Sequence, residues 1–219
     1  MKNLKNALLL KQLYLLKQLG YNYTSVTAFK EDEIDLTLPN TLEKLKKQAE
    51  ECHLCALSKS RHSVVFGEGN SHADIMFVGE APGATEDSSG KPFAGRSGEM
   101  LTKMIEHVLL ISRKDVYISN IVKCRPANNA EPSSSEAHSC LPYLLKQIEL
   151  IKPKIIIALG ATAYHYLSGD DSEISKVRGR MQEQHGYKLM PTYHPSYLLR
   201  NPSAKKDVLE DLKIIKGMM

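Results

Sequence analysis

Length, composition and charge limit what this chain of 219 residues can be. Hydrophobic residues make up 42% of it, enough for the core of one ordinary domain, and the net charge of +4 permits a polyanionic partner without requiring one. No run of about 18 apolar residues occurs, so we expect no membrane-spanning helix.

The first part of the chain is typical of a helical extension followed by a linker. Leucines recur at helical spacing over residues 3–19, and charged and amide side chains interrupt the apolar run. No small-residue cleavage site follows, so the pattern predicts an amphipathic helix rather than a signal peptide, and a cytoplasmic protein. We assign residues 1–45 to this extension and residues 46–219 to the main domain.

Strands alternate with helices from about residue 73 onward. Short apolar or β-branched runs predict four strands, at residues 73–79, 115–124, 153–160 and 187–195. Helical periodicity predicts helices at residues 41–55, 97–110, 133–153 and 203–218, with a possible capping box of Ser133 and Glu136. The alternation predicts an α/β fold with a mostly parallel central sheet, in which ligands bind beyond the carboxyl ends of the strands.

The first strand ends in a glycine-rich loop that carries acids. The segment VGEAPGATEDSSGKPFAGRSGEML, residues 78–101, lacks the Gly-Lys-Ser/Thr of a Walker loop and the Gly-x-Gly-x-x-Gly of a dinucleotide site. It carries Glu80, Glu86 and Asp87 where a phosphate favours no negative charge. Either the loop is a tight turn whose acids face water, or it holds a neutral hydrogen-bonding ligand or a cation near Glu80, with Phe93 as an aromatic shelf.

Polar side chains also end two other strands. Asn120 closes the second strand, and its amide can both donate and accept, so it can read the edge of a base. His194 closes the fourth strand, where a positioned imidazole can stabilise developing charge. Each residue taken alone is also compatible with an ordinary structural role.

The segment after His194 mixes phosphate donors with apolar side chains. Residues 196–200 read SYLLR, with two adjacent leucines. Leu198 and Leu199 either pack in the core or form a wedge that enters a base stack, as apolar side chains do in base-flipping proteins.

Four cysteines predict a metal site. Cys52 and Cys55 form a C-x2-C pair, and Cys124 and Cys140 follow far along the chain. In a reducing compartment such thiols more often ligate metal than form disulfides. All-thiolate ligation suits tetrahedral zinc or an iron–sulfur cluster, and spacing alone does not choose between them. We expect a structural site.

Together these segments resemble the iron–sulfur-containing branch, family 4, of the uracil-DNA glycosylase superfamily. The resemblance rests on the loop at 78–101, NIVKCRP, HPSYLLRNP and the four cysteines, and it covers roughly residues 50–215. It implies a three-layer α/β/α sandwich with a four-stranded parallel central sheet and a [4Fe-4S] cluster on the cysteines. It also implies a DNA repair enzyme that flips deoxyuridine out of single- or double-stranded DNA and hydrolyses its N-glycosidic bond with water, leaving an abasic site.

The resemblance assigns uracil contacts by position. Phe93 would stack on the flipped uracil, and Asn120 would bond its Watson–Crick edge. His194 would face the O2 side and stabilise the leaving uracil anion. Ala81, together with Glu80, would place the base and the attacking water through backbone and side chain.

The resemblance also assigns the carboxylates and the DNA contacts. Glu86 would stand near uracil C5, Leu198 would fill the gap left in the helix, and Ser196 and Arg200 would touch phosphate. Family 1 enzymes place an Asp where this chain has Ala81, so water activation falls to Glu80 or Glu86, and we favour Glu80. We further expect four basic residues to line the DNA face: Lys123, Arg125, Arg178 and Arg180.

Two other functions stay open at this point. The chain could be a non-catalytic iron–sulfur or zinc DNA-binding module, or a glycosylase of broader preference that also removes hypoxanthine or xanthine. We expect a monomer without membrane contact, and the N-terminal helix could dock a repair or replication partner.

Overall fold

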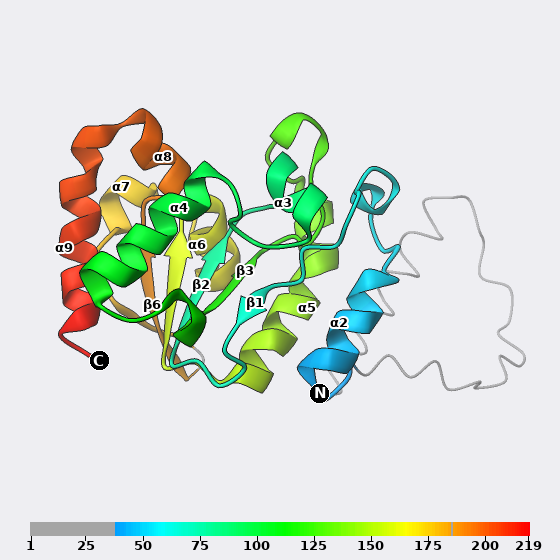
Figure 1. Cartoon of the computed structure of the whole chain (residues 1–219), viewed down its shortest axis with the longest axis horizontal. Coiled ribbons are helices and arrows are strands. Elements are labelled where there is room, and N and C mark those ends of the chain that lie inside the picture. Colours follow the sequence, from blue (N-terminus) through cyan, green and yellow to red (C-terminus); the bar gives the residue numbers. More distant parts are fainter. Residues whose placement is uncertain (1–37, 185) are drawn as a thin grey trace, which may run out of the picture. The chain divides into compact units, whose positions relative to one another are not determined.

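A computed structural model describes residues 38–184 and 186–219 of the chain (Figure 1). The amphipathic helix predicted at residues 3–19 lies outside the described residues. Within the described ranges, no helix is both long and apolar enough to cross a bilayer.

The compact unit that the structure describes begins at Leu38. Its first helix, α2 (Leu42–Glu50), buries Leu45, which packs in a small cluster with Phe66 and Tyr143. Residues 42–45 therefore belong to the main unit. The assignment of the preceding residues to a separate extension stays a prediction.

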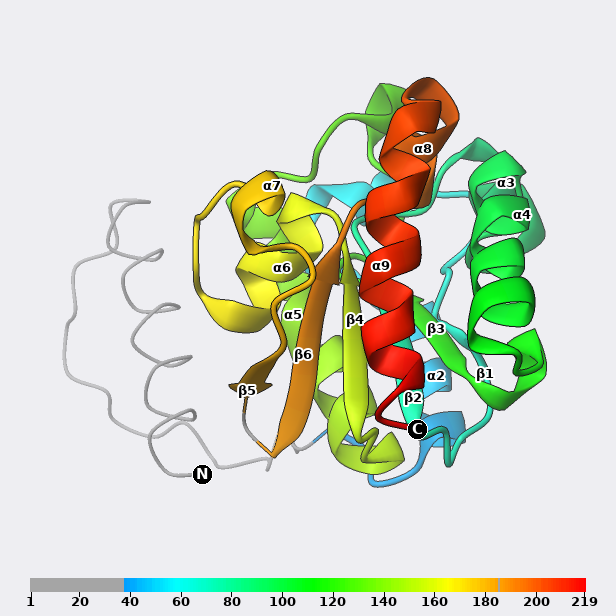
Figure 2. The ribbon, with the colours of Figure 1, turned by 90° about the vertical axis from the view of Figure 1, so that its left-hand side faces the viewer.

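A six-stranded sheet in the order β1-β3-β2-β4-β6-β5 forms the centre of this unit (Figure 2). Its four inner strands are parallel: β2 (Ile75–Gly79), β3 (Tyr117–Asn120), β4 (Ile155–Leu159) and β6 (Tyr187–Thr192). They confirm the predicted four-stranded parallel core. Two antiparallel edge strands were not predicted, because they are too short to show a period: β1 (Glu68–Gly69) and β5 (Gln182–Gln184).

Helices cover both faces of the sheet, as the alternation of side chains along a strand requires. On one face, Met76 and Val78 share a core with α5 (Ser134–Ile151) and α6 (Ala161–Ser168). On the other face, Ile75 and Phe77 pack with three helices: α4 (Arg96–Lys103), η2 (Met104–Leu109) and α9 (Lys205–Lys216). The figures show α6 and α9 on opposite sides of the sheet (Figure 2). This arrangement confirms the three-layer α/β/α sandwich.

The predicted helices form, but the one predicted at residues 41–55 ends at Glu50. Ser133 and Glu136 make the capping box at the start of α5, where the Ser133 N–H donates to Glu136 Oε2 at 2.8 Å. The helix predicted at 97–110 runs as α4 (Arg96–Lys103) and continues as a π-helix, η2 (Met104–Leu109). The helix predicted at 203–218 is α9 (Lys205–Lys216). The remaining helices are short: η1 (Ala56–Lys59), α3 (Ala84–Ser89), η3 (Arg113–Asp115), η4 (Ala127–Asn129), α7 (Ile174–Val177), α8 (Pro195–Arg200) and η5 (Pro202–Ala204).

Candidate active site

A cleft of about 690 Å³ lies beyond the carboxyl ends of the parallel strands. Residues that follow or end each of the four strands line it: Glu80, Asn120, Gly160 and His194. The structure therefore brings together residues from separate motifs. Five other predicted site residues also line this cleft: Ala81, Glu86, Phe93, Ser196 and Arg200.

Asn120 and Phe93 meet over a glycine at the end of β2. A Cβ at Gly79 would lie 2.5 Å from Asn120 Oδ1 and 2.7 Å from the Phe93 ring, so only glycine admits both side chains here. Asn120 is 2% exposed, and its Oδ1 accepts no hydrogen bond from any described residue. Because a buried acceptor without a partner costs about 1–3 kcal/mol, this amide oxygen is suited to a donor on a ligand.

Phe93 is held in an unusual backbone conformation beside Asn120. Its φ of 51° is left-handed, and the guanidinium of Arg113 donates to the carbonyl oxygens of Pro92 at 2.9 Å and Phe93 at 3.1 Å. A Cβ at Gly98 would lie 1.7 Å from the Phe93 carbonyl oxygen, so glycine is required there as well. No local sequence pattern marks Arg113, because only the folded chain brings its guanidinium to the Pro92 and Phe93 carbonyls.

His194 caps the N-terminus of α8 and is neutral. Its Nδ1 accepts the backbone N–H of Ser196 at 3.1 Å, and the Ser196 hydroxyl lies 2.7 Å away. Since a backbone N–H can only donate, Nδ1 carries no hydrogen and the ring proton resides on Nε2. Burial and the charge of Arg200, opposed by the charge of Glu86, together lower the pKa of His194 to about 4. The cleft is therefore lined by a neutral imidazole with an N–H donor.

Glu80 is a half-buried carboxylate directly after β2. Its Oε2 accepts a hydrogen bond from the hydroxyl of Thr162 at 2.6 Å. Burial raises the pKa of Glu80, the Thr162 hydrogen bond lowers it, and the negative charge of Glu131 raises it. A carboxylate with a raised pKa is suited to accept a proton.

Glu86 braces the glycine-rich loop. Its Oε2 accepts the N–H of Gly83 at 3.1 Å, and its Oε1 accepts the N–H groups of Ala94 and Gly95, each at 2.9 Å. The side chain is 8% exposed. With both oxygens occupied by backbone donors, Glu86 is better placed to fix the loop than to take a proton from water.

The segment at α8 differs from expectation in one respect. Leu198 is 1% exposed and belongs to the core beside α4 and α9, so it cannot enter a base stack in this structure. The neighbouring Leu199 is 43% exposed and Tyr197 is 38% exposed. Tyr197 stacks on Tyr193, with ring centroids 4.8 Å apart, and both tyrosines line the cleft. Leu199 therefore replaces Leu198 as the wedge candidate.

One of the basic residues expected on a DNA face is held inside the protein, and another is engaged in an ion pair. Lys123 is 2% exposed, and its ammonium group donates to three buried oxygens, one of them the carbonyl of Asn120 at 2.8 Å. Arg178 is paired with the buried Asp211, with Nη2 and Oδ1 2.6 Å apart. The expectation is wrong for Lys123 and stays a prediction for Arg125, Arg178 and Arg180.

The four cysteines lie close together and are unpaired. Cys124 lies within electrostatic range of Cys52 and Cys55, and Cys140 lies within range of Cys52 and Cys124. Within residues 38–184 and 186–219, no three His, Cys, Asp or Glu side chains gather tightly enough for one metal ion.

Two nitrogen donors face the cysteine sulfurs. Arg61 Nη1 donates to Cys124 Sγ at 3.4 Å, and the Lys123 backbone N–H donates to Cys140 Sγ at 3.3 Å. Burial raises the pKa of the Cys140 thiol to about 12, so a thiolate there depends on compensating positive charge. The donor set fits a thiolate-bound iron cluster, whose sulfurs accept such hydrogen bonds.

Comparison with known families decides the relationship. The family model described as the uracil DNA glycosylase superfamily matches residues 66–213, which include all four parallel strands and the residues of the cleft from Glu80 to Arg200. The chain belongs to the uracil DNA glycosylase superfamily.

Curated members of this superfamily are similar over most of their length. A type-4 uracil-DNA glycosylase of Saccharolobus solfataricus is 45% identical over 185 residues, covering 81% of this chain and 86% of the relative. One of Thermotoga maritima is 45% identical over 187 residues, covering 84% of this chain and 97% of the relative. Because each match covers more than four fifths of this chain, it spans the positions of all four cysteines.

Proposed function

We propose that this protein is a uracil-DNA glycosylase, which hydrolyses the N-glycosidic bond of deoxyuridine in DNA and releases uracil. The observation that carries the proposal is the meeting of Asn120, Phe93 and His194 in one cleft, with the amide oxygen of Asn120 buried and unpartnered among the described residues. The similarity to type-4 uracil-DNA glycosylases supports it.

Each of these side chains matches a feature of uracil. The Asn120 amide oxygen accepts the N3–H of the base, and the Phe93 ring stacks on its face. Cleavage leaves negative charge on the uracil, which the Nε2–H of His194 stabilises by hydrogen bonding at O2. Flipping the base out of the stack costs a few kcal/mol, and these contacts offset that cost.

Glu80 takes the proton of the attacking water. It lines the same cleft with a raised pKa, and the backbone of Ala81 helps to place the water and the base. Its negative charge also favours the positive charge that builds up on the sugar. Glu86 holds the loop through three backbone N–H groups, so its part in catalysis is to fix Phe93 and its neighbours.

DNA contacts come from the exposed side of α8. Arg200 and Ser196 line the cleft and bind phosphate, and the exposed Leu199 fills the gap left by the flipped base. The substrate is single- or double-stranded DNA that contains uracil. A broader glycosylase would need room for hypoxanthine or xanthine, and a non-catalytic module would give no reason for the cleft residues to converge.

The cysteines hold a [4Fe-4S] cluster, with zinc as the alternative. Cys52, Cys55, Cys124 and Cys140 would ligate it, and Arg61 and the Lys123 backbone would donate hydrogen bonds to their sulfurs. When bound, the cluster supplies structural cross-linking, since glycosidic hydrolysis needs no redox step. We further propose a cytoplasmic monomer whose N-terminal helix docks a repair or replication protein, a proposal that rests on the sequence pattern of residues 3–19.

The proposed activity is tested by base release from uracil-containing oligonucleotides, single- and double-stranded, followed by alkaline cleavage of abasic sites. The wild-type protein should cut at uracil, and Asn120→Ala should lower kcat/KM by on the order of 10²-fold, because a buried recognition bond is lost. Asn40→Ala, at an exposed site, is the matched control. Wild-type protein with an intact cluster that leaves such DNA uncut would contradict the proposal.

Arg113→Met should weaken uracil recognition without touching the base. The variant loses the bonds to the Pro92 and Phe93 carbonyls, so the shelf shifts. Misplacement by about 1 Å can cost on the order of 10²-fold, and we expect a kcat/KM loss of about 10-fold or more. Steady-state kinetics check it, with the exposed Arg96→Met as control. Unchanged kcat/KM in the Arg113 variant would show that the shelf needs no such support.

A further inference from the structure

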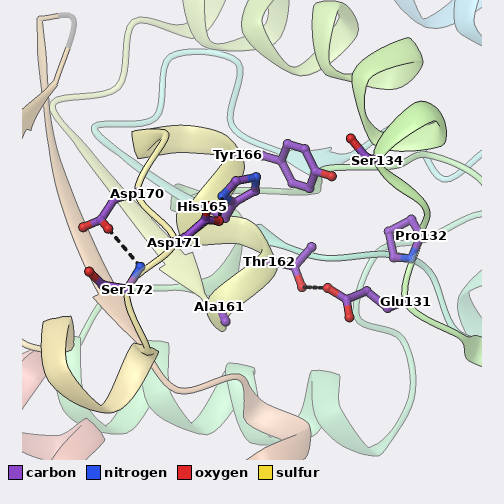
Figure 3. A pocket seen from close by; sticks show the side chains of 10 residues that line it. All are labelled: Glu131, Pro132, Ser134, Ala161, Thr162, His165, Tyr166, Asp170, Asp171 and Ser172. Carbon is purple, nitrogen blue, oxygen red and sulfur yellow. Dashed lines mark hydrogen bonds and ion pairs between the residues drawn. The ribbon is translucent and has the colours of Figure 1, made fainter.

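A threonine hydroxyl lies between two carboxylates at the edge of the cleft. Thr162, in the first turn of α6, is buried, and its Oγ1 lies 2.6 Å from Glu80 Oε2 and 3.1 Å from Glu131 Oε1. Figure 3 shows Thr162 and Glu131 pointing toward one another. The three side chains come from the loop after β2, the loop before α5 and the start of α6, so no local sequence pattern brings them together.

Thr162 stands in the wall between two cavities. Together with Ala161 it lines the active-site cleft and also a second cavity of about 350 Å³ (Figure 3). Glu131 lines the second cavity and is exposed, whereas Glu80 lines the cleft and is half-buried. The hydroxyl therefore connects a carboxylate that faces the substrate to one that faces solvent.

A hydroxyl has one hydrogen and can satisfy only one of the two carboxylates as donor. While Glu80 is ionised, Thr162 donates to it over the shorter distance, and Glu131 faces the hydroxyl oxygen without a full hydrogen bond. If Glu80 gains a proton on Oε2, it can donate to Thr162 Oγ1, and the Thr162 hydrogen can turn to Glu131. All three groups then keep a hydrogen-bond partner, so Glu80 can take up a proton without leaving a polar group of this cluster unpaired.

We propose that Thr162 and Glu131 are positioning residues that make Glu80 an effective base for the attacking water. The inference deepens the proposed function and rests on it. As the C1′–N1 bond breaks, its electron pair leaves with uracil. A water oxygen bonds to C1′ and gives one proton to Glu80, while the Thr162 hydrogen bond switches from Glu80 to Glu131. The proton then passes to solvent, directly or through Thr162 and Glu131.

Two neighbours act on the protonation of Glu80 in opposite directions. The Thr162 hydrogen bond lowers the pKa of Glu80, and the Glu131 charge raises it, while burial raises it most. The other titratable or charged groups that line the two cavities are Glu86, Tyr193, His194, Tyr197, Arg200, His165, Tyr166, Asp170 and Asp171. Because Thr162 lowers the pKa of Glu80 and Glu131 raises it, replacing each residue should shift the pH profile in opposite directions.

The test compares pH profiles of uracil release by the full-length protein and its variants T162V, T162S and E131Q. T162V should lower kcat about tenfold with KM unchanged, a part of the 10²–10⁴-fold that general base catalysis contributes. It should also move the acid limb of kcat to higher pH, because the bond that favours the carboxylate is lost. E131Q should move that limb to lower pH, because a negative neighbour is lost. T162S should return the limb to the wild-type position.

Asp171→Asn is the control, since Asp171 lines the second cavity but pairs with His165, not with Thr162. It should leave kcat and the acid limb in place. The proposal would be overturned if T162V and E131Q both kept the wild-type kcat and acid limb. It would also be overturned if the acid limbs of the two variants moved in the same direction. If T162V does not fold, E131Q at the exposed Glu131 still decides the question. A wild-type protein that releases no uracil would instead refute the proposed function itself.

Discussion

Replacing His194 by Ala is expected to lower the single-turnover rate of uracil release by on the order of 10²–10³-fold. The ring is neutral, because its Nδ1 accepts the Ser196 N–H, so its Nε2–H can donate to the uracil oxygen as negative charge develops there. The loss should fall on the chemical step, because the hydrogen bond strengthens as the bond to the sugar breaks. Rapid-quench kinetics on a uracil oligonucleotide measure it.

The pH dependence of the rate of uracil release distinguishes the role of His194 from that of Glu80. Burial holds the pKa of His194 at about 4, below its unfolded value of about 6.5, so the ring stays neutral in the native protein as pH falls to about 4. An acid limb above that pH therefore reports protonation of Glu80, whose pKa is raised. The limb should persist in His194→Ala, and the exposed His107→Ala should match the wild type. Loss of the acid limb in His194→Ala, or an unchanged rate of uracil release in that variant, would refute the role assigned to His194.

Replacing Cys140 by Ser is expected to cost more stability than any other single change proposed for this protein. A structural metal site contributes its binding free energy to folding, and such sites are worth about 10 kcal/mol or more in small domains. Loss of even about 4 kcal/mol lowers the unfolding midpoint of a domain of this size by roughly 10 °C. The variant should also lose iron and the absorbance of thiolate-bound iron at about 400 nm.

Anaerobic purification, metal analysis and thermal unfolding check this prediction, with the neighbouring Ser139→Ala as control. Iron content and a melting temperature equal to the wild type in Cys140→Ser would show that Cys140 is no ligand. A colourless wild-type protein with one bound zinc would replace the cluster by the zinc alternative and leave the four ligands in place.

The sequence by itself determined the architecture and the residues of the cleft. Four apolar runs alternate with helical periods, and parallel strands bring their carboxyl ends to one edge, so Glu80, Asn120 and His194 had to meet there. The order of the glycine loop, NIVKCRP and HPSYLLRNP carried the family resemblance, which the comparisons confirm.

The tertiary structure decided which side chains are free to act. Leu198 and Leu199 are adjacent and identical in type, but the side of α8 that packs on the core buries the first and exposes the second. Lys123 looks like a surface cation, yet three buried oxygens surround its ammonium group. Burial of this kind depends on contacts between distant segments, which local patterns do not encode.

Contacts between distant segments also give the three acids of the glycine-rich loop different roles. Glu86 and Asp87 bind backbone N–H groups of their own loop and of residues 62–63, so they shape the cleft. Glu80 alone of the three meets Thr162, a residue 82 positions away in the chain. A sequence pattern can place a carboxylate at a strand end, but only the folded chain supplies the partner that sets its proton affinity.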